Sequence, residues 1–376
     1  MKYRTMGKLG IQSSAFGLGC MRFNGAASGD SVIDEQKAVS LIRRAIDGGV
    51  NYIDTAWVYL DKTSEIVLGK ALRDGYREKV TIATKVPPDA VNSRQDMEKI
   101  LAEELEKLQT DHIDFYLMHA MNKQKWEHMK AIGAPEFFND MQREGKIRYR
   151  CFSFHGPYDE FEYILNDWDW DMVQIQYNFM DINNQAGTKG LELAGSKGIP
   201  VVIMEGLLGG RLATAPDNVQ AMYDAFPVKR SPVEWAFRWL CDHPQVSVVL
   251  SGCNEPEQID DNLRIFDAAL PGVMSRNELQ LIDEVRAAYL SRTRIGCTGC
   301  RYCMPCPNGV NIPGIFATWN SVSLYGIDHT KDWGWNMLRQ NNSGADQCVE
   351  CGACENACPQ HLPIIEQLKC AWSELA

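Results

Sequence analysis

The feature that most restricts the fold is an alternation that runs from about residue 14 to residue 267. Short apolar runs rich in Val, Ile and Tyr are each followed by a longer stretch in which apolar residues recur at helical spacing. The eight runs read SAFGLGC, VNYIDT, VTIATK, IDFYLMH, IRYRCFS, MVQIQYN, IPVVIME and VSVVLSG. Strands that alternate with helices form parallel sheets, and eight such units predict a closed (β/α)8 barrel, the TIM barrel.

An open, doubly wound sheet is the alternative arrangement of such units. It would place a Gly-x-Gly-x-x-Gly turn after an early strand, and the sequence has no such turn there. Helical stretches of the barrel include 34–48, 93–109 and 232–242, and one further helix is expected over 277–290. The barrel is therefore the favoured α/β architecture.

The two ends of the barrel region also have predicted structures. The opening residues carry Gly7 and Gly10 between short extended pieces, which predicts a hairpin across the bottom of the barrel. After the last helix the sequence SRTRIG is basic and loop-like. We therefore expect a boundary near Ser291, with a barrel domain over 1–290 and a smaller domain over 291–376.

Two cysteine runs lie within the smaller domain. The first holds Cys297, Cys300, Cys303 and Cys306 before a proline, and the second holds Cys348, Cys351, Cys354 and Cys358 before a proline. The second run has the spacing of the bacterial ferredoxin motif, and the first is one residue shorter in its last gap. Zinc sites instead use two cysteine pairs separated by a knuckle. The spacing therefore favours 4Fe-4S clusters over zinc.

In two-cluster ferredoxins the fourth cysteine of each run ligates the other cluster. By that analogy, one set consists of Cys297, Cys300, Cys303 and Cys358, and the other consists of Cys348, Cys351, Cys354 and Cys306. Residues 307–347 between the runs have helical character. This favours a mainly helical, ferredoxin-like iron–sulfur domain with two clusters, although the short gap leaves one cluster as the alternative.

Composition excludes several classes of function. The formal net charge is −11, and no lysine- or arginine-rich run is present. Such a chain is not expected to bind nucleic acid or an anionic membrane. No apolar stretch has the length of a membrane span, and the first residues lack the apolar segment of a secretory signal.

Five further cysteines lie outside the runs. They are Cys20, Cys151, Cys241, Cys253 and Cys370, and they are scattered through apolar segments. Free cysteine is commonly a small buried hydrophobe. Thiolate ligands of iron also require a reducing compartment, so the expected location is the cytoplasm.

Ionisable residues end several of the predicted strands. Asp54 ends the second run with Tyr59 shortly after it, Lys85 ends the third and His119 ends the fourth. Each alone could be a helix cap, a solvated lysine or a core histidine. In a (β/α)8 barrel, however, the C-terminal ends of the strands meet on one face. Four ionisable groups at neighbouring strand ends therefore predict a catalytic site.

These residues carry a resemblance to a known family. The segments NYIDTAWVY, SEIVLGKAL, ATK and YLMH resemble the aldo-keto reductases, and the similarity extends from about residue 3 to residue 267. The resemblance implies that Asp54, Tyr59, Lys85 and His119 form the catalytic tetrad. It also implies a small carbonyl or alcohol substrate and NAD(P)H as the cofactor. The C-terminal region resembles the ferredoxin-like tail of a subset of prokaryotic members.

The chemistry of these side chains agrees with that implication. Reduction of a carbonyl needs a hydride, which a nicotinamide carries, and a proton for the oxygen. Tyr59 would donate the proton, and a cationic Lys85 would lower the pKa of the phenol. Asp54 would hold Lys85 in place, and His119 would donate to the substrate oxygen or help to relay the proton.

The resemblance also implies cofactor contacts. Ser153 and Gln176 match carboxamide-binding positions of the family. The phosphate-binding and adenine-binding positions are Glu205, Gly206, Leu207, Gly209, Gly210, Arg211, Gly252, Asn254, Gln258 and Asn262.

Several positions depart from the family pattern. Phe154 replaces an asparagine that binds the carboxamide, and Met204 replaces a tyrosine that stacks on the nicotinamide. Gly252 and Gln258 replace the Lys and Arg that grip the 2′-phosphate of NADP. Because a 2′-phosphate prefers cationic partners, these changes leave NADP, NAD and even a flavin open.

Two modules of different electron chemistry leave three functions to be tested. Nicotinamide transfers two electrons as hydride, whereas a cubane cluster exchanges one. The first function is a nicotinamide-dependent aldo-keto reductase. The second is a cluster-driven reductase that uses a flavin or a redox partner protein as its electron source. The third is a redox sensor or electron carrier without catalysis.

Overall fold

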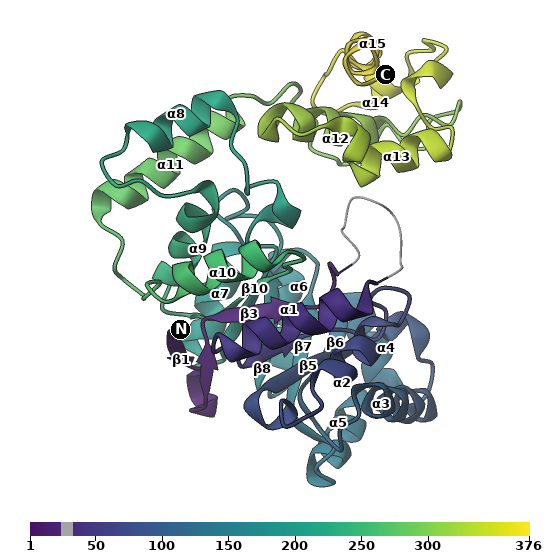
Figure 1. The fold of residues 1–376 in the computed structure, drawn as a ribbon. Coiled ribbons are helices and arrows are strands. Elements are labelled where there is room, and N and C mark those ends of the chain that lie inside the picture. The colour runs from purple at the N-terminus through teal and green to yellow at the C-terminus, as the bar shows by residue number, and fades with distance from the viewer. Residues whose placement is uncertain (24–32) are drawn as a thin grey trace. The chain divides into compact units, whose positions relative to one another are not determined.

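The computed structural model describes residues 1–23 and 33–376, which form two compact units (Figure 1). The barrel unit consists of Met1–Gly209 and Val233–Leu279. The cysteine unit consists of Gly210–Pro232 and Gln280–Ala376. The cysteine unit thus includes a segment that precedes it by many residues, whereas the expected domains were continuous. The boundary near Ser291 stays a prediction.

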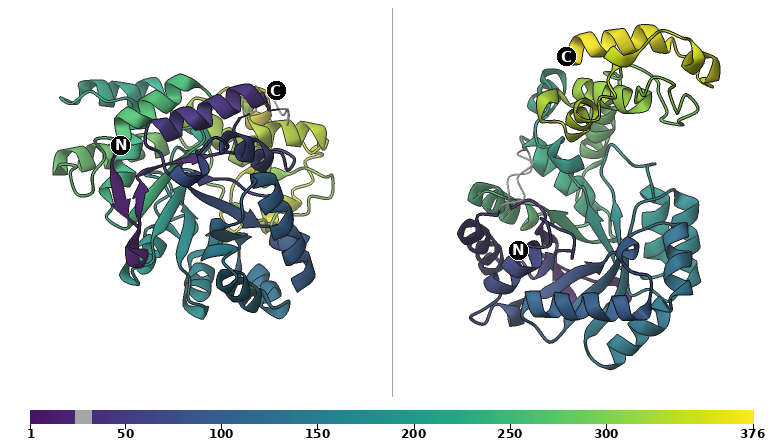
Figure 2. Two further views of the ribbon diagram at one scale, coloured as in Figure 1. Left: turned by 60° about the horizontal axis from the view of Figure 1, so that its bottom comes forward. Right: turned by 90° about the vertical axis from the view of Figure 1, so that its right-hand side faces the viewer.

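Eight parallel strands close into a barrel, in the order β10-β3-β4-β5-β6-β7-β8-β9. Figures 1 and 2 show the barrel strands surrounded by helices. They are β3 (Phe16–Gly19), β4 (Tyr52–Asp54), β5 (Thr81–Val86), β6 (Ile113–Met121), β7 (Ile147–Phe154), β8 (Met172–Gln176), β9 (Val201–Met204) and β10 (Val246–Ser251). Each begins within one of the eight apolar runs, and β5, β6 and β7 extend one or two residues beyond their runs, to Val86, Met121 and Phe154. The pairing of Val249 with Phe16 joins the last strand to the first. The closed barrel is therefore confirmed.

Helices of the barrel unit follow the strands along the chain. They are α1 (Glu35–Asp47), α2 (Ser64–Ala71), α3 (Arg94–Leu108), α4 (Lys123–Ala131), α5 (Ala134–Arg143), α6 (Tyr158–Asp167), α7 (Gly187–Ser196), α9 (Pro232–Asp242) and α10 (Pro256–Phe266). The Asp34 side chain accepts the N–H of Lys37, and the Ser93 side chain accepts the N–H of Asp96. These N-caps explain why α1 and α3 begin where the sequence predicted.

A hairpin closes the bottom of the barrel, as predicted. Strand β1 (Tyr3–Thr5) pairs antiparallel with β2 (Gln12–Ser14). Between them, Met6 is fully buried in a cluster with Tyr52, Ala83 and Phe115. Because this cluster fills the N-terminal end of the barrel, the opposite end is where a ligand can enter.

The cysteine unit is built from helices and loops. Its helices are α8 (Asp217–Ala225), α11 (Arg276–Leu290, which begins in the barrel unit), α12 (Ile312–Tyr325), α13 (Trp333–Gln340), α14 (Ala353–Ala357) and α15 (Ile364–Leu375). Phe316, Trp319, Trp335 and Leu368 are buried in one apolar core. Helices α12 and α13 lie between the two cysteine runs, so the predicted helical character of 307–347 is confirmed.

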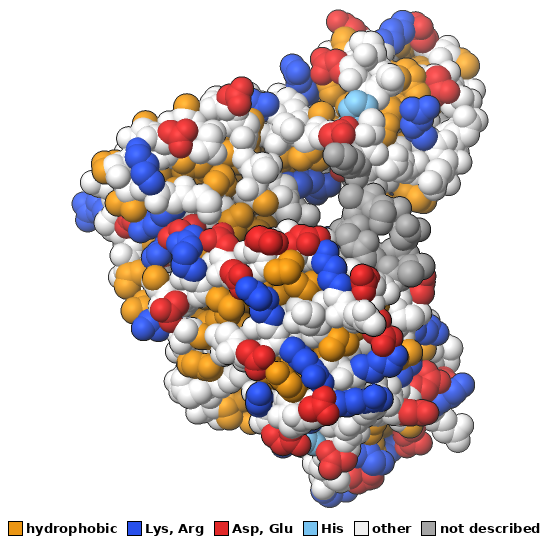
Figure 3. All heavy atoms as spheres, viewed as in Figure 1, with side chains coloured by type: hydrophobic (Ala, Val, Ile, Leu, Met, Phe, Trp, Pro, Cys, Tyr) orange, Lys and Arg blue, Asp and Glu red, His pale blue; other side chains and the backbone are white. Residues whose placement is uncertain are grey.

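Short 3-10 turns complete the described secondary structure, at η1 (Gly7–Leu9), η2 (Arg77–Lys79), η3 (Pro88–Ala90), η4 (Leu208–Gly210), η5 (His329–Lys331) and η6 (Ala345–Gln347). On the face shown in Figure 3, acidic and basic side chains are interspersed over the barrel unit. Ion pairs such as Arg44–Asp260 and Lys70–Glu35 account for part of this mixing. Within the described ranges, no helix is both long enough and apolar enough to traverse a bilayer.

Candidate active site

Three of the four predicted catalytic residues meet at the C-terminal ends of β4 and β5. Lys85 Nζ donates to Asp54 Oδ1 at 2.7 Å, to the carbonyl oxygen of Thr55 at 2.6 Å and to Tyr59 OH at 3.3 Å. The side chains of Lys85 and Asp54 are 0% and 4% exposed. The two strands are neighbours in the barrel, so their end residues lie side by side. The result is a buried chain of hydrogen bonds from a carboxylate through an ammonium to a phenol.

His119 completes the group from the next strand. Its ring stands edge-on to that of Tyr59, with centroids 5.8 Å apart. Strand β6 shifts register between Met118 and Met121, and Ala120 has a φ of 49°. Irregularities of this kind redirect side chains at strand ends. The structure therefore brings all four predicted residues together at one mouth of the barrel.

Burial sets the protonation states in this group. Burial raises the pKa of Tyr59, and the nearby Lys85 ammonium opposes that rise only in part. Lys85 therefore lowers the pKa of the phenol as expected, but burial has the larger effect, and the net pKa of Tyr59 lies above its ordinary value. Burial, and after it the charge of Lys85, lowers the pKa of His119 to about 3. Tyr59 is thus a protonated phenol and His119 a neutral imidazole at physiological pH.

Lys85 remains charged despite its burial. Desolvation lowers the pKa of Lys85, but the charge of Asp54 and the hydrogen bonds with Asp54 and Tyr59 outweigh it and raise the pKa above its ordinary value. The second oxygen of the carboxylate, Asp54 Oδ2, is buried without a hydrogen-bond partner. The Asp54 carboxylate therefore interacts mainly with the Lys85 ammonium.

The two predicted carboxamide-binding residues end the next strands, β7 and β8. Ser153 Oγ accepts the N–H of Ala120 at 2.8 Å and keeps its own proton free to donate. Gln176 Nε2 donates to Asp181 Oδ2 at 2.9 Å, while Gln176 Oε1 is buried without a partner. An unpaired buried acceptor costs free energy, so a ligand N–H that reaches it is favoured. A hydroxyl donor and an unpaired amide acceptor fit a primary carboxamide such as that of nicotinamide.

The loop after β9 has an unusual backbone. Glu205, Leu208, Gly209 and Gly210 have φ values of 58°, 50°, 67° and 97°. Leu207 lies within this loop. A Cβ at Gly206 would lie 2.7 Å from Leu240 Cδ1, so packing requires that glycine. Leu208, Gly209 and Gly210 thus form a run of left-handed residues that departs from both strand and helix geometry. The part of this loop in phosphate binding stays a prediction.

Arg211 has a different partner from the one predicted. Its Nη2 pairs with Asp332 Oδ2 at 3.0 Å within the cysteine unit. Asp332 also caps α13 by accepting the N–H of Trp335. An arginine engaged in this way has less capacity to bind a phosphate, so its role in cofactor binding stays a prediction.

The predicted cofactor-binding residues after β10 form hydrogen bonds within the turn that follows this strand. Gln258 Oε1 accepts the N–H of Asn254 at 2.9 Å. Asn262 is buried, and its Nδ2 donates to Ser251 Oγ and Cys253 Sγ. These contacts shape the turn and leave fewer of the side-chain groups for an adenine. Their part in cofactor binding also stays a prediction.

Sequence reasoning missed Arg22, which lies against Gly252. A Cβ at Gly252 would lie 2.8 Å from Arg22 Cγ, and a Cβ at Gly209 would lie 3.9 Å from Arg22 Nη2. The available signal was a basic residue shortly after the first barrel strand, close to the exit of β3. That signal is weak, because an isolated arginine after a strand is usually solvated.

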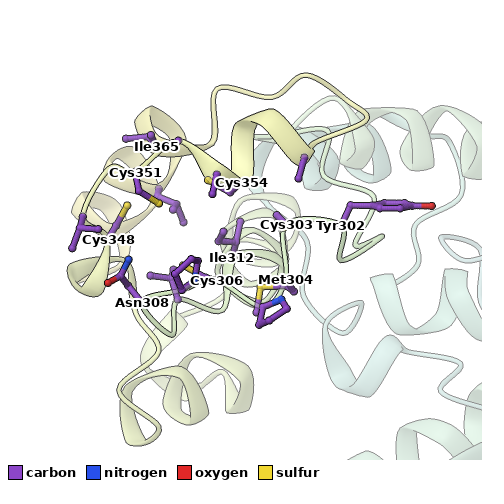
Figure 4. A pocket seen from close by; sticks show the side chains of 18 residues that line it. Tyr302, Cys303, Met304, Cys306, Asn308, Ile312, Cys348, Cys351, Cys354 and Ile365 are labelled. Atoms are coloured by element: carbon purple, nitrogen blue, oxygen red, sulfur yellow. The ribbon is translucent and has the colours of Figure 1, made fainter.

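The two cysteine runs surround two cavities in the cysteine unit. The smaller, of about 20 Å³, is lined by Cys297, Cys300, Cys303 and Cys358 among others. The larger, of about 140 Å³, is lined by Cys306, Cys348, Cys351 and Cys354, together with Cys303 (Figure 4). Each cavity thus gathers the four cysteines of one predicted ligand set.

The cysteines surround space and do not meet at a point. All of the chain's thirteen cysteines are free thiols. Among the described residues, no three Cys, His, Asp or Glu side chains converge on a position for a single ion. Zinc would need four ligands at about 2.0–2.3 Å from one centre. In the larger cavity, of about 140 Å³, the arrangement therefore fits a cluster better than a single zinc ion.

Comparisons with known proteins agree with both halves of the chain. The model for the aldo/keto reductase family matches residues 15–286, and the model for a 4Fe-4S dicluster domain matches residues 296–362. The NADH-specific methylglyoxal reductase of Escherichia coli (strain K12) is 25% identical over 320 residues, covering 72% of this chain and 95% of that protein.

Two further likenesses concern the barrel. Aldo-keto reductase YhdN of Bacillus subtilis (strain 168) is 37% identical over 127 residues, covering 32% of this chain and 38% of that protein. The holo form of aldo-keto reductase AKR11C1 from Bacillus halodurans has a TM-score of 0.64 and 26% identity, covering 76% of this chain and 96% of that chain. Because the first family match spans more than half of the sequence, this chain is an oxidoreductase that belongs to the aldo/keto reductase family and carries a C-terminal 4Fe-4S dicluster domain.

Proposed function

We propose that this protein reduces a small carbonyl compound with a nicotinamide cofactor, and that Tyr59 donates the proton to the carbonyl oxygen. The observation that carries the proposal is the buried chain of hydrogen bonds from Asp54 through Lys85 to Tyr59. As the substrate oxygen gains charge, the phenol can release its proton to it. The adjacent ammonium stabilises the phenolate that remains.

The other residues of the group position this proton transfer. Asp54 keeps Lys85 charged and fixes the direction of its N–H bonds. The neutral His119 imidazole can donate one N–H to the same substrate oxygen, which would orient the carbonyl toward Tyr59. Nicotinamide, when bound, would supply the hydride. Ser153 and Gln176 would hold its carboxamide through the free hydroxyl proton and the unpaired oxygen.

We further propose that NADH is preferred to NADPH. The turn after β10 carries no cation at Gly252 or Gln258, and Glu257 lies in the first turn of α10. The N-cap residue Glu255 is already paired with Lys37 at 2.6 Å. Negative charge there disfavours a 2′-phosphate. The similar Escherichia coli reductase is named as NADH-specific and as acting on methylglyoxal. A small ketone or aldehyde of that kind is the first substrate to test.

The experiment is a titration of anaerobically purified full-length protein with NADH and NADPH, followed by turnover with methylglyoxal and simple aldehydes. We expect saturable binding, with the tighter affinity for NADH, and loss of nicotinamide absorbance that depends on the carbonyl compound. Absence of nicotinamide binding would contradict the proposal. So would a tightly bound flavin recovered from the purified protein.

The cysteine cavities favour a second candidate function. Clusters in them could pass single electrons between a redox partner protein and the barrel, which would require a flavin or a direct transfer instead of hydride. Cluster reduction by an added one-electron donor, coupled to carbonyl reduction without nicotinamide, would support this function. Either function would require a reducing compartment for the thiolate ligands, and the cytoplasm is the proposed location.

A further inference from the structure

Tyr59 lies on a short loop whose two ends are joined by a pair of hydroxyl groups. This Tyr59 loop runs from Thr55, directly after β4, to Ser64, the first residue of α2. Thr55 Oγ1 and Ser64 Oγ are 2.9 Å apart, and both side chains are fully buried. The hydroxyl pair therefore closes the base of the loop in a place where solvent does not compete for its hydrogen bond.

The protons of the hydroxyl pair have one consistent arrangement. Ser64 Oγ lies 2.7 Å from the carbonyl oxygen of Cys20, which can only accept, so the single proton of Ser64 is donated there. The contact between the two hydroxyls then requires Thr55 to donate and Ser64 to accept. The Cys20 N–H in turn donates to the carbonyl oxygen of Asp54 at 2.8 Å. The pair thus ties the start of α2 to the exits of β3 and β4.

The same loop holds both groups of the proposed proton transfer. The carbonyl oxygen of Thr55 accepts a hydrogen bond from the Lys85 ammonium at 2.6 Å. The N–H of Tyr59 donates to the carbonyl oxygen of Ala56 at 3.0 Å, and the N–H of Ser64 donates to the carbonyl oxygen of Tyr59 at 3.4 Å. The base of the loop therefore fixes the Tyr59 backbone and one acceptor of Lys85. The distance of 3.3 Å between Lys85 Nζ and Tyr59 OH depends on both.

The loop is under backbone strain directly after Tyr59. Three successive residues have positive φ values of 52°, 52° and 67°, and they are Leu60, Asp61 and Lys62. Glycine is favoured in this left-handed region, so other residues persist there only where surrounding contacts hold them. The hydroxyl pair supplies such a contact at the base of the loop. Without it, the strained residues would relax and displace Tyr59.

We propose that Thr55 and Ser64 are positioning residues, whose hydroxyl pair holds the Tyr59 phenol in place for proton transfer. This inference rests on the proposed function and deepens it. Because both hydroxyl protons are donated within the protein, the pair acts through Tyr59 and Lys85 and not on the substrate itself. A displacement of about 1 Å at a reacting group can lower a rate by about 10²-fold, so a small shift of the loop is enough.

The principal test compares Thr55→Val with Thr55→Ser in the full-length, cluster-loaded protein. Valine keeps the shape of threonine and removes the hydroxyl, whereas serine keeps the hydroxyl. We expect Thr55→Val to lower kcat for carbonyl reduction by about 10- to 100-fold, with KM and the dissociation constant for NADH unchanged. Thr55→Ser should recover most of the rate, because it restores the donor. A loss due to packing alone would be larger in Thr55→Ser, which has the smaller side chain.

Ser64→Ala provides an independent test. It removes the acceptor of the Thr55 hydroxyl and the donor to Cys20, so kcat should again fall with KM unchanged. Combining it with Thr55→Val should cost little more than Ser64→Ala alone, because both substitutions break one contact. Ser14→Ala is the matched control, since Ser14 is also fully buried and donates to the carbonyl oxygen of Phe16. Ser14 belongs to the hairpin at the opposite end of the barrel, so this variant should keep the wild-type kcat.

Hydrogen exchange of the Tyr59 loop separates this inference from the proposed function. The measurement follows the backbone N–H groups of Tyr59 and Ser64 and does not depend on turnover. We expect them to exchange about tenfold faster in Thr55→Val than in the wild type, in line with the loss of one hydrogen bond. Thr55→Ser should exchange at close to the wild-type rate.

Two results would overturn the inference. One is a kcat in Thr55→Val within about twofold of a wild type that does reduce carbonyl compounds. The other is loop exchange that Thr55→Val leaves unchanged. A wild type without carbonyl turnover, combined with faster exchange in Thr55→Val, would retain the hydroxyl pair as the contact that holds Tyr59 and would overturn the proposed function instead.

Discussion

Lys85 Nζ lies 2.7 Å from Asp54 Oδ1, with both side chains buried between neighbouring barrel strands. An ion pair of this kind is costly to desolvate and costly to break. A functional role of the Lys85 ammonium would explain why the barrel contains such a pair. The hydrogen bond from Lys85 to Tyr59 OH indicates that this role is to stabilise the phenolate.

Tyr59→Phe should remove the proton donor and leave the rest of the site in place. We expect carbonyl reduction to fall by about 10²- to 10⁴-fold, the usual contribution of a general acid. The affinity for NADH and the visible absorbance of the clusters should not change. Full activity in this variant, measured as nicotinamide oxidation, would rule out the proposed acid.

Lys85→Met should destabilise the protein, because it leaves the buried charge of Asp54 without a partner. The expected loss is about 3–5 kcal/mol of unfolding free energy, measured by denaturant titration. Adding Asp54→Asn should restore much of the stability by removing that charge, but not the activity. If the double variant were as unstable as Lys85→Met, the cost would have to arise from lost packing instead of an uncompensated charge.

The pH dependence of reduction should be set by Tyr59 alone among the four residues. Burial raises the pKa of Tyr59 above its ordinary value, so the phenol stays protonated through neutral pH. The pKa of His119 is lowered to about 3, so this imidazole stays neutral over the same range. We expect kcat/KM for carbonyl reduction to be flat from about pH 6 to 9 and to decline only as the phenol ionises.

A His119→Gln variant checks the assignment of the profile. Glutamine retains an N–H donor and cannot titrate, so the shape of the profile should not change even if the rate falls. An inflection between pH 6 and 7 that disappears in this variant would mean that His119 does ionise there, contrary to its burial.

Single cysteine substitutions should report which thiols share a cluster. Cys306 and Cys351 line the same cavity. The variants Cys306→Ser and Cys351→Ser should therefore each lose the iron of one cluster. The double variant should lose no more than either alone. Cys300→Ser combined with Cys351→Ser should lose both clusters, since Cys300 lines the other cavity. Iron analysis and electron paramagnetic resonance of dithionite-reduced protein would measure this.

Cys370→Ser is the matched control for these variants. Cys370 is exposed and lines neither cavity, so its replacement should leave the iron content unchanged. If the Cys306 and Cys351 variants together lost more iron than each alone, the crossed assignment of ligands would be wrong.

Much of the fold could be predicted because it depends on local patterns. Apolar runs of strand length separated by helical stretches predict parallel strands, and Asp34 and Ser93 mark the helix starts by capping their own first turns. The four residues at the strand ends could be predicted for a related reason. In a barrel, a residue's place at a strand's end already says which face it occupies.

The structure differs from the sequence-based predictions where a property depends on burial or on contacts between residues far apart in the chain. The pKa of Tyr59 depends on how completely the surrounding strands exclude water, which no run of residues states. Arg211 lies in a glycine-bearing segment typical of a phosphate loop, yet it pairs with Asp332. Asn262 stands on the helix after the last strand, yet its amide fastens the turn beside Cys253.

The sequence by itself determined the eight strands, the helices that join them, the residues at the strand ends and the cysteine spacing, because each follows from spacing along the chain. Only the tertiary structure decided that Arg22 lies over Gly252, because barrel closure is what brings the exit of the first barrel strand beside that of the last. Likewise, the separation of the cysteines into two cavities depends on the packing of helices between the runs. Contacts of that kind join residues far apart in sequence, so they exist only once the core has formed.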